Sequence, residues 1–151
     1  MESNKEIVSD LKELLAILND GKEGYESAAE ATDKIELQGL FLKYAAQRAG
    51  YAEELRTHIA THGTTADNER GGILGALHRT WIDIKQALSS KEDLAILNAI
   101  TTGEMAALDK YNHHIANDED HADHLQLLQR QRDGILNALK EIETLITQRS
   151  A

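Results

Sequence analysis

The chain has 151 residues, the size of a single domain with its own hydrophobic core, so we expect one domain over residues 1–151. Hydrophobic residues make up 41% of it, but aromatics only 4%, and proline is absent, a composition that favours long helices over strands. Its 26 acidic and 16 basic residues give a net charge of -10, which repels nucleic acids and anionic membrane surfaces. Cysteine is absent, which excludes disulfides, thiolate metal ligands and thiol catalysis.

The sequence also gives an expectation of location. It contains no apolar run long enough to cross a bilayer, and residues 1–5 lack the basic start and apolar middle of a signal peptide. We therefore expect a cytoplasmic protein with neither nucleic acid nor a membrane as its partner.

The first half of the chain predicts two long helices. Ser3 and Glu6 have the S-x-x-E spacing of a capping box, in which each side chain satisfies a free amide of the first turn. Apolar residues then recur every three or four positions, which predicts a helix over about 4–32, and a second such stripe predicts another over about 34–62. Because only a tight turn separates them, the two helices are expected to pack antiparallel.

The second half predicts a crossover followed by another helix pair. A polar, glycine-containing loop over 64–72 leads into a shorter helix over about 72–88, and two further stripes predict long helices over about 90–116 and 120–148. The expected fold is all-α, with two antiparallel helix hairpins joined by a crossover that contains the shorter helix. Such a crossover could travel most of the length of the fold, and we expect it to make the first and third long helices parallel.

Three stretches carry a resemblance to a known family: Gly75–Lys85 in the crossover, Leu40-Phe41-Leu42 followed by Gln47-Arg48, and Gly103-Glu104 followed by Tyr111. Over nearly its whole length the chain resembles small bacterial ferritin-like proteins of unknown function, distantly related to rubrerythrins and to the stress-associated YciF-type proteins. The resemblance implies a ferritin-like four-helix bundle and a link to stress response, but no established activity.

A ferritin-like di-iron centre takes a glutamate from each of two helices and a Glu-x-x-His pair from each of the other two. This chain contains no Glu-x-x-His. Relative to the Leu-Phe landmark of rubrerythrin-like proteins, Arg48 and Tyr51 occupy the places of that glutamate and histidine. Glu23 and Glu26 on the first helix, and Glu104 in the third stripe, could still point inward. The resemblance therefore implies a degenerate di-iron centre.

We hypothesise that a guanidinium group replaces the metal. Arg48, with Arg132 as a second candidate, would neutralise Glu104 and a first-helix glutamate, because a buried carboxylate needs a partner that supplies both charge and donors. The alternative is that both arginines reach solvent and bury only their stems. The predicted structural polar core consists of Arg48, Tyr51, Glu104, Gln131 and Arg132.

Histidine is a common ligand of transition metals, and the seven histidines fall into clusters. Glu54, His58 and His62 are spaced by four near the end of the second long helix; they could hold a zinc or copper ion, or form a solvated helix end. With the first and third helices parallel, the last turn would lie at the opposite end of the bundle from His58. Four histidines lie around that turn: His113, His114, His121 and His124. Chance binding of a metal ion is one interpretation of this cluster, and no metal binding is the other.

Two functions remain open. The one that we favour is a non-catalytic structural or interaction bundle, with no cofactor and a link to stress response. The alternative is an iron- or manganese-binding protein or oxidoreductase with an irregular ligand shell. A homodimer through an exposed apolar strip around Phe41 is a further hypothesis. The candidate metal ligands are Glu23, Glu26, Glu54 (or Glu53), His58 and Glu104.

Overall fold

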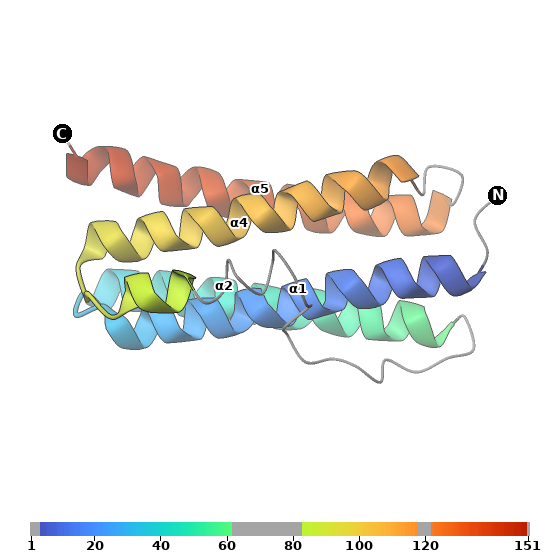
Figure 1. Ribbon diagram of the computed structural model, residues 1–151, viewed down its shortest axis with the longest axis horizontal. Coiled ribbons are helices and arrows are strands. Elements are labelled where there is room, and N and C mark those ends of the chain that lie inside the picture. Colours follow the sequence, from blue (N-terminus) through green and yellow to red (C-terminus); the bar gives the residue numbers. More distant parts are fainter. Residues whose placement is uncertain (1–3, 62–82, 118–121, 151) are drawn as a thin grey trace.

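The structure is a computed structural model that describes residues 4–61, 83–117 and 122–150. The described residues form four long helices. They lie lengthwise along one axis (Figure 1). No strand occurs among the residues described, which confirms the all-α class. Most of the predicted crossover, including His78 and Trp81, lies outside them, as does His62 of the predicted second helix, although residues 83–88 are helical. The long helices are α1 (Asn4–Ala31), α2 (Ile35–Ala60), α4 (Asp93–Asn117) and α5 (Ala122–Ser150).

A short turn joins α1 to α2, and its hydrogen bonds are made by Thr32. The Thr32 hydroxyl oxygen accepts a bond from the amide of Lys34 at 3.2 Å and donates to Asp93 Oδ1 of α4 at 3.2 Å. The Gln38 side chain donates to the carbonyl of Thr32 at 3.1 Å. Since three residues cannot cross the width of a second helix, the two helices fold back on each other as a hairpin, and α4 and α5 form the second hairpin (Figure 1).

The direction of α4 corrects one prediction. Figure 1 shows that α4 runs parallel to α2 and opposite to α1, so the prediction that the first and third long helices are parallel is wrong. The physical reason is that a connection spanning the fold returns the chain to the end at which α2 began. As a consequence, the C-terminal ends of α2 and α4 lie at the same end of the structure, so His58 and His114 lie toward one end and not at opposite ends.

The buried apolar side chains form two clusters along the axis. The first contains residues from the α1–α2 turn end, among them Tyr25, Phe41 and Ile142. The second, nearer the other end, is built around Leu14 and Leu55. Phe41 is 0% exposed, so the hypothesis that it lies in an exposed strip for dimerisation is wrong. It falls on the same face of α2 as the other buried residues of that helix.

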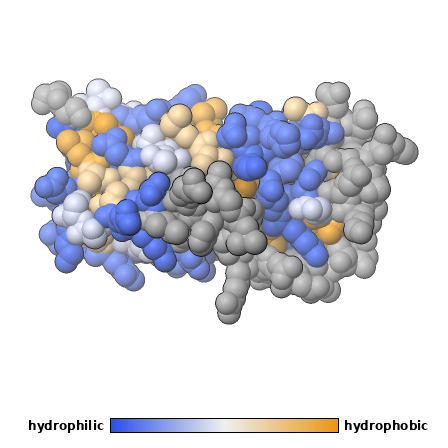
Figure 2. Space-filling model, viewed as in Figure 1, coloured by the Kyte–Doolittle hydropathy of each residue, from blue (hydrophilic) through white to orange (hydrophobic). Residues whose placement is uncertain are grey.

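The face of the molecule that Figure 2 draws is largely polar where residues are described. On the face drawn in Figure 2, hydrophilic residues cover much of the described surface, and hydrophobic residues show between them in smaller areas. The large hydrophobic side chains that are exposed among the described residues are Ile35, Leu42 and Met105. None of the helices in the described ranges is both long enough and apolar enough to span a membrane.

Candidate functional site

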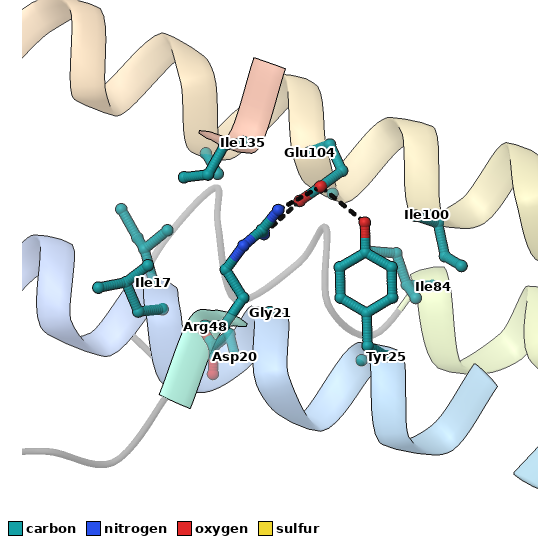
Figure 3. Close-up of a pocket in the computed structure, with 13 residues that line it drawn as sticks. Ile17, Asp20, Gly21, Tyr25, Arg48, Ile84, Ile100, Glu104 and Ile135 are labelled. Carbon is teal, nitrogen blue, oxygen red and sulfur yellow. Dashed lines mark hydrogen bonds and ion pairs between the residues drawn. The ribbon is translucent and has the colours of Figure 1, made fainter. Parts of the chain in front are cut away.

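A buried ion pair joins the two hairpins. The guanidinium group of Arg48 on α2 donates two bonds to the carboxylate of Glu104 on α4, from Nη1 to Oε1 and from Nη2 to Oε2, both at 2.6 Å. The hydroxyl of Tyr25 on α1 donates to the same Oε2 at 2.7 Å. Figure 3 shows these three side chains converging from three helices, so both carboxylate oxygens are occupied.

Helical periodicity places the two charged residues inside the fold. On α2, Arg48 lies two turns after Phe41 and two turns before Leu55, both of which are 0% exposed. On α4, Glu104 follows Ile100 by four residues, again on the buried face. Arg48 is 1% exposed and Glu104 is 3% exposed. The helical periodicity therefore places both charged side chains in the interior, where each requires a hydrogen-bonded partner of opposite charge.

The remaining contacts of Arg48 complete its environment. Its Nε donates to Gln47 Oε1 at 3.1 Å, and its guanidinium carbon lies 5.4 Å from the ring centroid of Tyr25, within the range of a cation–π contact. Bidentate Arg–carboxylate pairs of this kind fix geometry as well as charge. Removing one partner of a buried pair leaves an uncompensated charge and typically costs about 3–5 kcal/mol.

The electrostatic surroundings keep the tyrosine neutral and the arginine charged. Burial raises the pKa of Tyr25 well above its ordinary value, and the negative charge of Glu104 raises it further. Burial alone would lower the pKa of Arg48, but the charge and hydrogen bonds of Glu104 outweigh that effect and raise it. The Tyr25 hydroxyl is thus a hydrogen-bond donor throughout the ordinary pH range, and its bond to Glu104 was not predicted from the sequence.

A cavity of about 50 Å³ lies beside the pair. Gly103 leaves room for Ile84 of the short helical segment 83–88, because a Cβ at Gly103 would come within 3.0 Å of Ile84 Cδ1. The cavity is large enough for water. Asp20, which is 7% exposed, is the buried acidic residue of α1 at its wall. The other lining residues in view in Figure 3 include Ile17, Gly21, Ile100 and Ile135.

The two first-helix glutamates predicted as inward ligands lie elsewhere. Glu23 and Glu26 are both exposed, so the prediction that they point inward is wrong. The reason is their register: Tyr25, which is 2% exposed, faces the interior between them, and residues one or two positions away on a helix point to other faces.

Arg132 was predicted to share the central role, and the structure places it at the surface. Its Nη2 lies 3.1 Å from Asp133 Oδ1, and its Nη1 donates to Asn112 Oδ1 at 3.4 Å. The hypothesis that Arg132 neutralises a buried carboxylate is therefore wrong, and its side chain follows the solvent-reaching alternative. The neighbouring Gln131 takes the inward position and is 0% exposed.

Gln131 is the centre of a second polar group, between α5, α4 and α2. Its Oε1 accepts a bond from the buried hydroxyl of Tyr111 at 2.7 Å. Its Nε2 donates to the carbonyl of Tyr51 and to Glu54 Oε1, both at 3.1 Å. Tyr51 is half-buried, with its hydroxyl lying over Gly134, where an added Cβ would be only 1.9 Å from it. Gln131 and Tyr51, both assigned to the predicted polar core, therefore belong to this second group and not to the hydrogen bonds between Arg48 and Glu104.

Glu54 and His58 were predicted as metal ligands with His62. Glu54 instead binds Arg130, whose Nη2 is 2.8 Å from Oε2. Burial alone would raise the pKa of Glu54, but hydrogen bonds from Arg130 and Gln131 together lower it below its usual value. His58 is half-buried and lines an open surface pocket with Glu54 and Leu127, while His62 lies outside the described residues.

His114 forms an unexpected contact between α4 and α1. Its Nε2 lies 2.8 Å from Glu13 Oε1, and its Nδ1 lies 3.6 Å from Asp10 Oδ2. His114 is 5% exposed, whereas the adjacent His113 is exposed. Asp10 and Glu13 are three residues apart on one face of α1, a spacing in the sequence that could have suggested a basic partner. Within residues 4–61, 83–117 and 122–150, no group of three or more His, Asp or Glu side chains is placed to hold a metal ion.

The described residues thus define a protein of long antiparallel hairpins that are locked together by a buried ion pair. Residues 6–117 match a family described as Domain of unknown function (DUF2383). This match covers well over half of the chain, so the protein belongs to that family. Neither the curated proteins nor the solved structures contain a match to the chain.

Proposed function

We propose that the protein is a ferritin-like helical bundle with a degenerate di-iron centre, and that it acts as a non-catalytic structural or interaction protein. The observation that carries the proposal is the bidentate bond of Arg48 to Glu104, at 2.6 Å on each side. A metal ion would need oxygens of that carboxylate, and both already accept bonds from a fixed cation.

Two further features support the proposal. The inward carboxylate of α1 at this level is Asp20 and not Glu23 or Glu26, so the ligand spacing expected of a ferritin-like centre is missing. In addition, α2 and α4 run parallel, which is the arrangement that one long crossover between two hairpins produces. The resemblance to stress-associated proteins extends the proposal to a role in the stress response of a bacterium.

The test is elemental analysis of untagged protein purified from cells supplied with iron and manganese. We expect far less than one metal ion per chain, and no difference between the wild type and Glu104→Gln, which keeps the shape of the side chain but removes its charge. The matched control is Glu26→Gln, which changes an exposed carboxylate on α1.

Near-stoichiometric iron or manganese that Glu104→Gln loses and Glu26→Gln retains would overturn the proposal. The protein would then be the alternative considered above, an iron- or manganese-binding ferritin-like protein or oxidoreductase. Circular dichroism of each variant is needed to establish that its helices are intact, so that lost metal is not mistaken for lost fold.

A further inference from the structure

The outward face of α2 carries an apolar strip where the outward faces of α1 and α5 are polar. On α1 the exposed residues include Glu23, Glu26 and Glu30. The exposed strip of α2, which we call the α2 stripe, recurs every three or four residues and consists of Ile35, Gly39, Leu42, Ala46 and Gly50.

The α2 stripe contains two of the three large apolar side chains that are exposed among the described residues. Ile35 is 81% exposed and Leu42 is 54% exposed. They lie two turns apart on one face of the helix, so they form one surface and not two isolated positions. A contiguous exposed apolar surface is a candidate for association with another chain.

The two glycines of the stripe have no close neighbour in the part of the chain that the structure describes. Glycine in the middle of a helix weakens it relative to alanine, and it is usually retained where another group approaches closely. A Cβ added at Gly134 would collide with Tyr51, whereas one added at Gly39 or Gly50 would meet nothing within 4 Å. Within residues 4–61, 83–117 and 122–150, no group approaches these two glycines closely enough to explain them, so we look for that group in a partner.

We propose that the α2 stripe binds the same stripe of a second copy of the chain, with the two α2 helices antiparallel across a twofold axis near Ala46. Leu42 and Gly50 lie four residues on either side of Ala46. The twofold axis therefore sets the Leu42 side chain of each copy against the bare backbone at Gly50 of the other. The large residue of each copy thus fits against the small residue of the other, so the stripe is complementary to itself.

The charges beside the stripe favour the antiparallel arrangement. In the first half of α2 and its N-cap, Lys34 and Lys43 outnumber Glu36. In the second half, Glu53 and Glu54 outnumber Arg56. Two antiparallel copies bring halves of opposite net sign together, whereas two parallel copies would bring like halves together. A uniformly basic or acidic partner would meet charges of both signs, so a second copy fits this surface best.

The inference goes beyond the proposed function and does not depend on it, because Arg48 and Glu104 face the interior and the stripe faces solvent. Sedimentation equilibrium of the full chain tests it, at concentrations up to about 100 μM, a range that detects a Kd in the micromolar region. We expect a dimer that Leu42→Glu weakens at least about tenfold in Kd, which corresponds to about 1.4 kcal/mol. The control is Met105→Glu, which charges a comparably exposed apolar residue (57%) on α4 and should leave the dimer unchanged.

A second measurement locates the axis. The chain has no cysteine, so Ala46→Cys introduces a single thiol that the proposed twofold axis brings close to its own copy. Under mild oxidation we expect Ala46→Cys to form a disulfide-linked dimer much faster than Met105→Cys. A monomeric wild type at every concentration, a dimer that Leu42→Glu does not weaken, or equal crosslinking of the two cysteine variants would overturn the inference.

Discussion

Two arginine–carboxylate pairs connect α2 to the second hairpin, and they differ in burial. The side chains of Arg48 and Glu104 are 1% and 4% exposed, whereas those of Arg130 and Glu54 are 56% and 37% exposed. Their chemistry is the same, but water can replace a lost partner only in the second pair. The comparison teaches that burial decides how much each pair contributes to the free energy of unfolding. Three of the four predictions below test it, and the other tests the packing between α5 and α2.

The largest effect is expected at the buried pair. Arg48→Met leaves the Glu104 carboxylate inside the fold with Tyr25 as its one remaining hydrogen-bond partner among the described residues, which should lower the free energy of unfolding by about 3–5 kcal/mol. Guanidinium denaturation followed by circular dichroism measures this loss. The double variant Arg48→Met with Glu104→Leu replaces both charges by apolar groups and should recover most of it. If the double variant loses as much as the two single variants combined, the two charges are not coupled and the comparison fails.

The second prediction concerns packing between α5 and α2. Gly134→Ala places a methyl group where the Tyr51 hydroxyl lies and forces the ring to move, which should cost about 1–3 kcal/mol. Gly39→Ala, where the added carbon meets nothing, is the matched control and should stabilise the helix by about 0.4–1 kcal/mol. Thermal unfolding at low protein concentration measures both. Equal effects would show that Tyr51 does not pack against Gly134.

The third prediction concerns the tyrosine that completes the buried pair. Tyr25→Phe removes a hydrogen bond to a charged group and should cost about 1.5 kcal/mol. Because burial raises the pKa of Tyr25 above 10.0, the unfolded chain loses this proton first, so its contribution to stability is complete below pH 10 and falls as the pH rises further. Denaturation at a series of alkaline pH values should therefore show a steeper loss in the wild type than in Tyr25→Phe. Parallel curves would mean that this hydroxyl titrates normally.

The smallest effect is expected at the exposed pair. Arg130→Ala should cost less than about 1 kcal/mol, because both side chains are partly solvated. The pKa of Glu54 is lowered, so the stability from this pair is present above the unfolded pKa of the carboxyl and is lost as the pH falls through its folded value. The difference between the wild type and Arg130→Ala should therefore vanish in acid and shrink at high salt. A loss as large as that of Arg48→Met would contradict the comparison.

The sequence predicted much of this structure, since apolar periodicity alone indicates the long helices and puts Arg48 and Glu104 on buried faces. It could not give the direction of α4, which depends on where a crossover ends in space. Nor could it separate Gln131 from Arg132, because one residue of helical rotation decides which of them faces inward. The partners of Tyr25 and His114 were missed for the same reason: contacts between helices depend on register, which no single stripe contains.

The position of the central pair along the axis has a consequence of its own. On α2 it lies between Tyr44 of one apolar cluster and Ala52 of the other. Packing between apolar side chains is not directional, so two apolar faces alone could also dock in a position shifted by one helical turn, about 5.4 Å. A guanidinium that donates two bonds to one carboxylate can do so in only one relative position of the two helices. Any shift along the axis would leave two unpaired charges buried among apolar side chains. The pair therefore fixes the register in which the two hairpins pack, among several registers with similar apolar contacts.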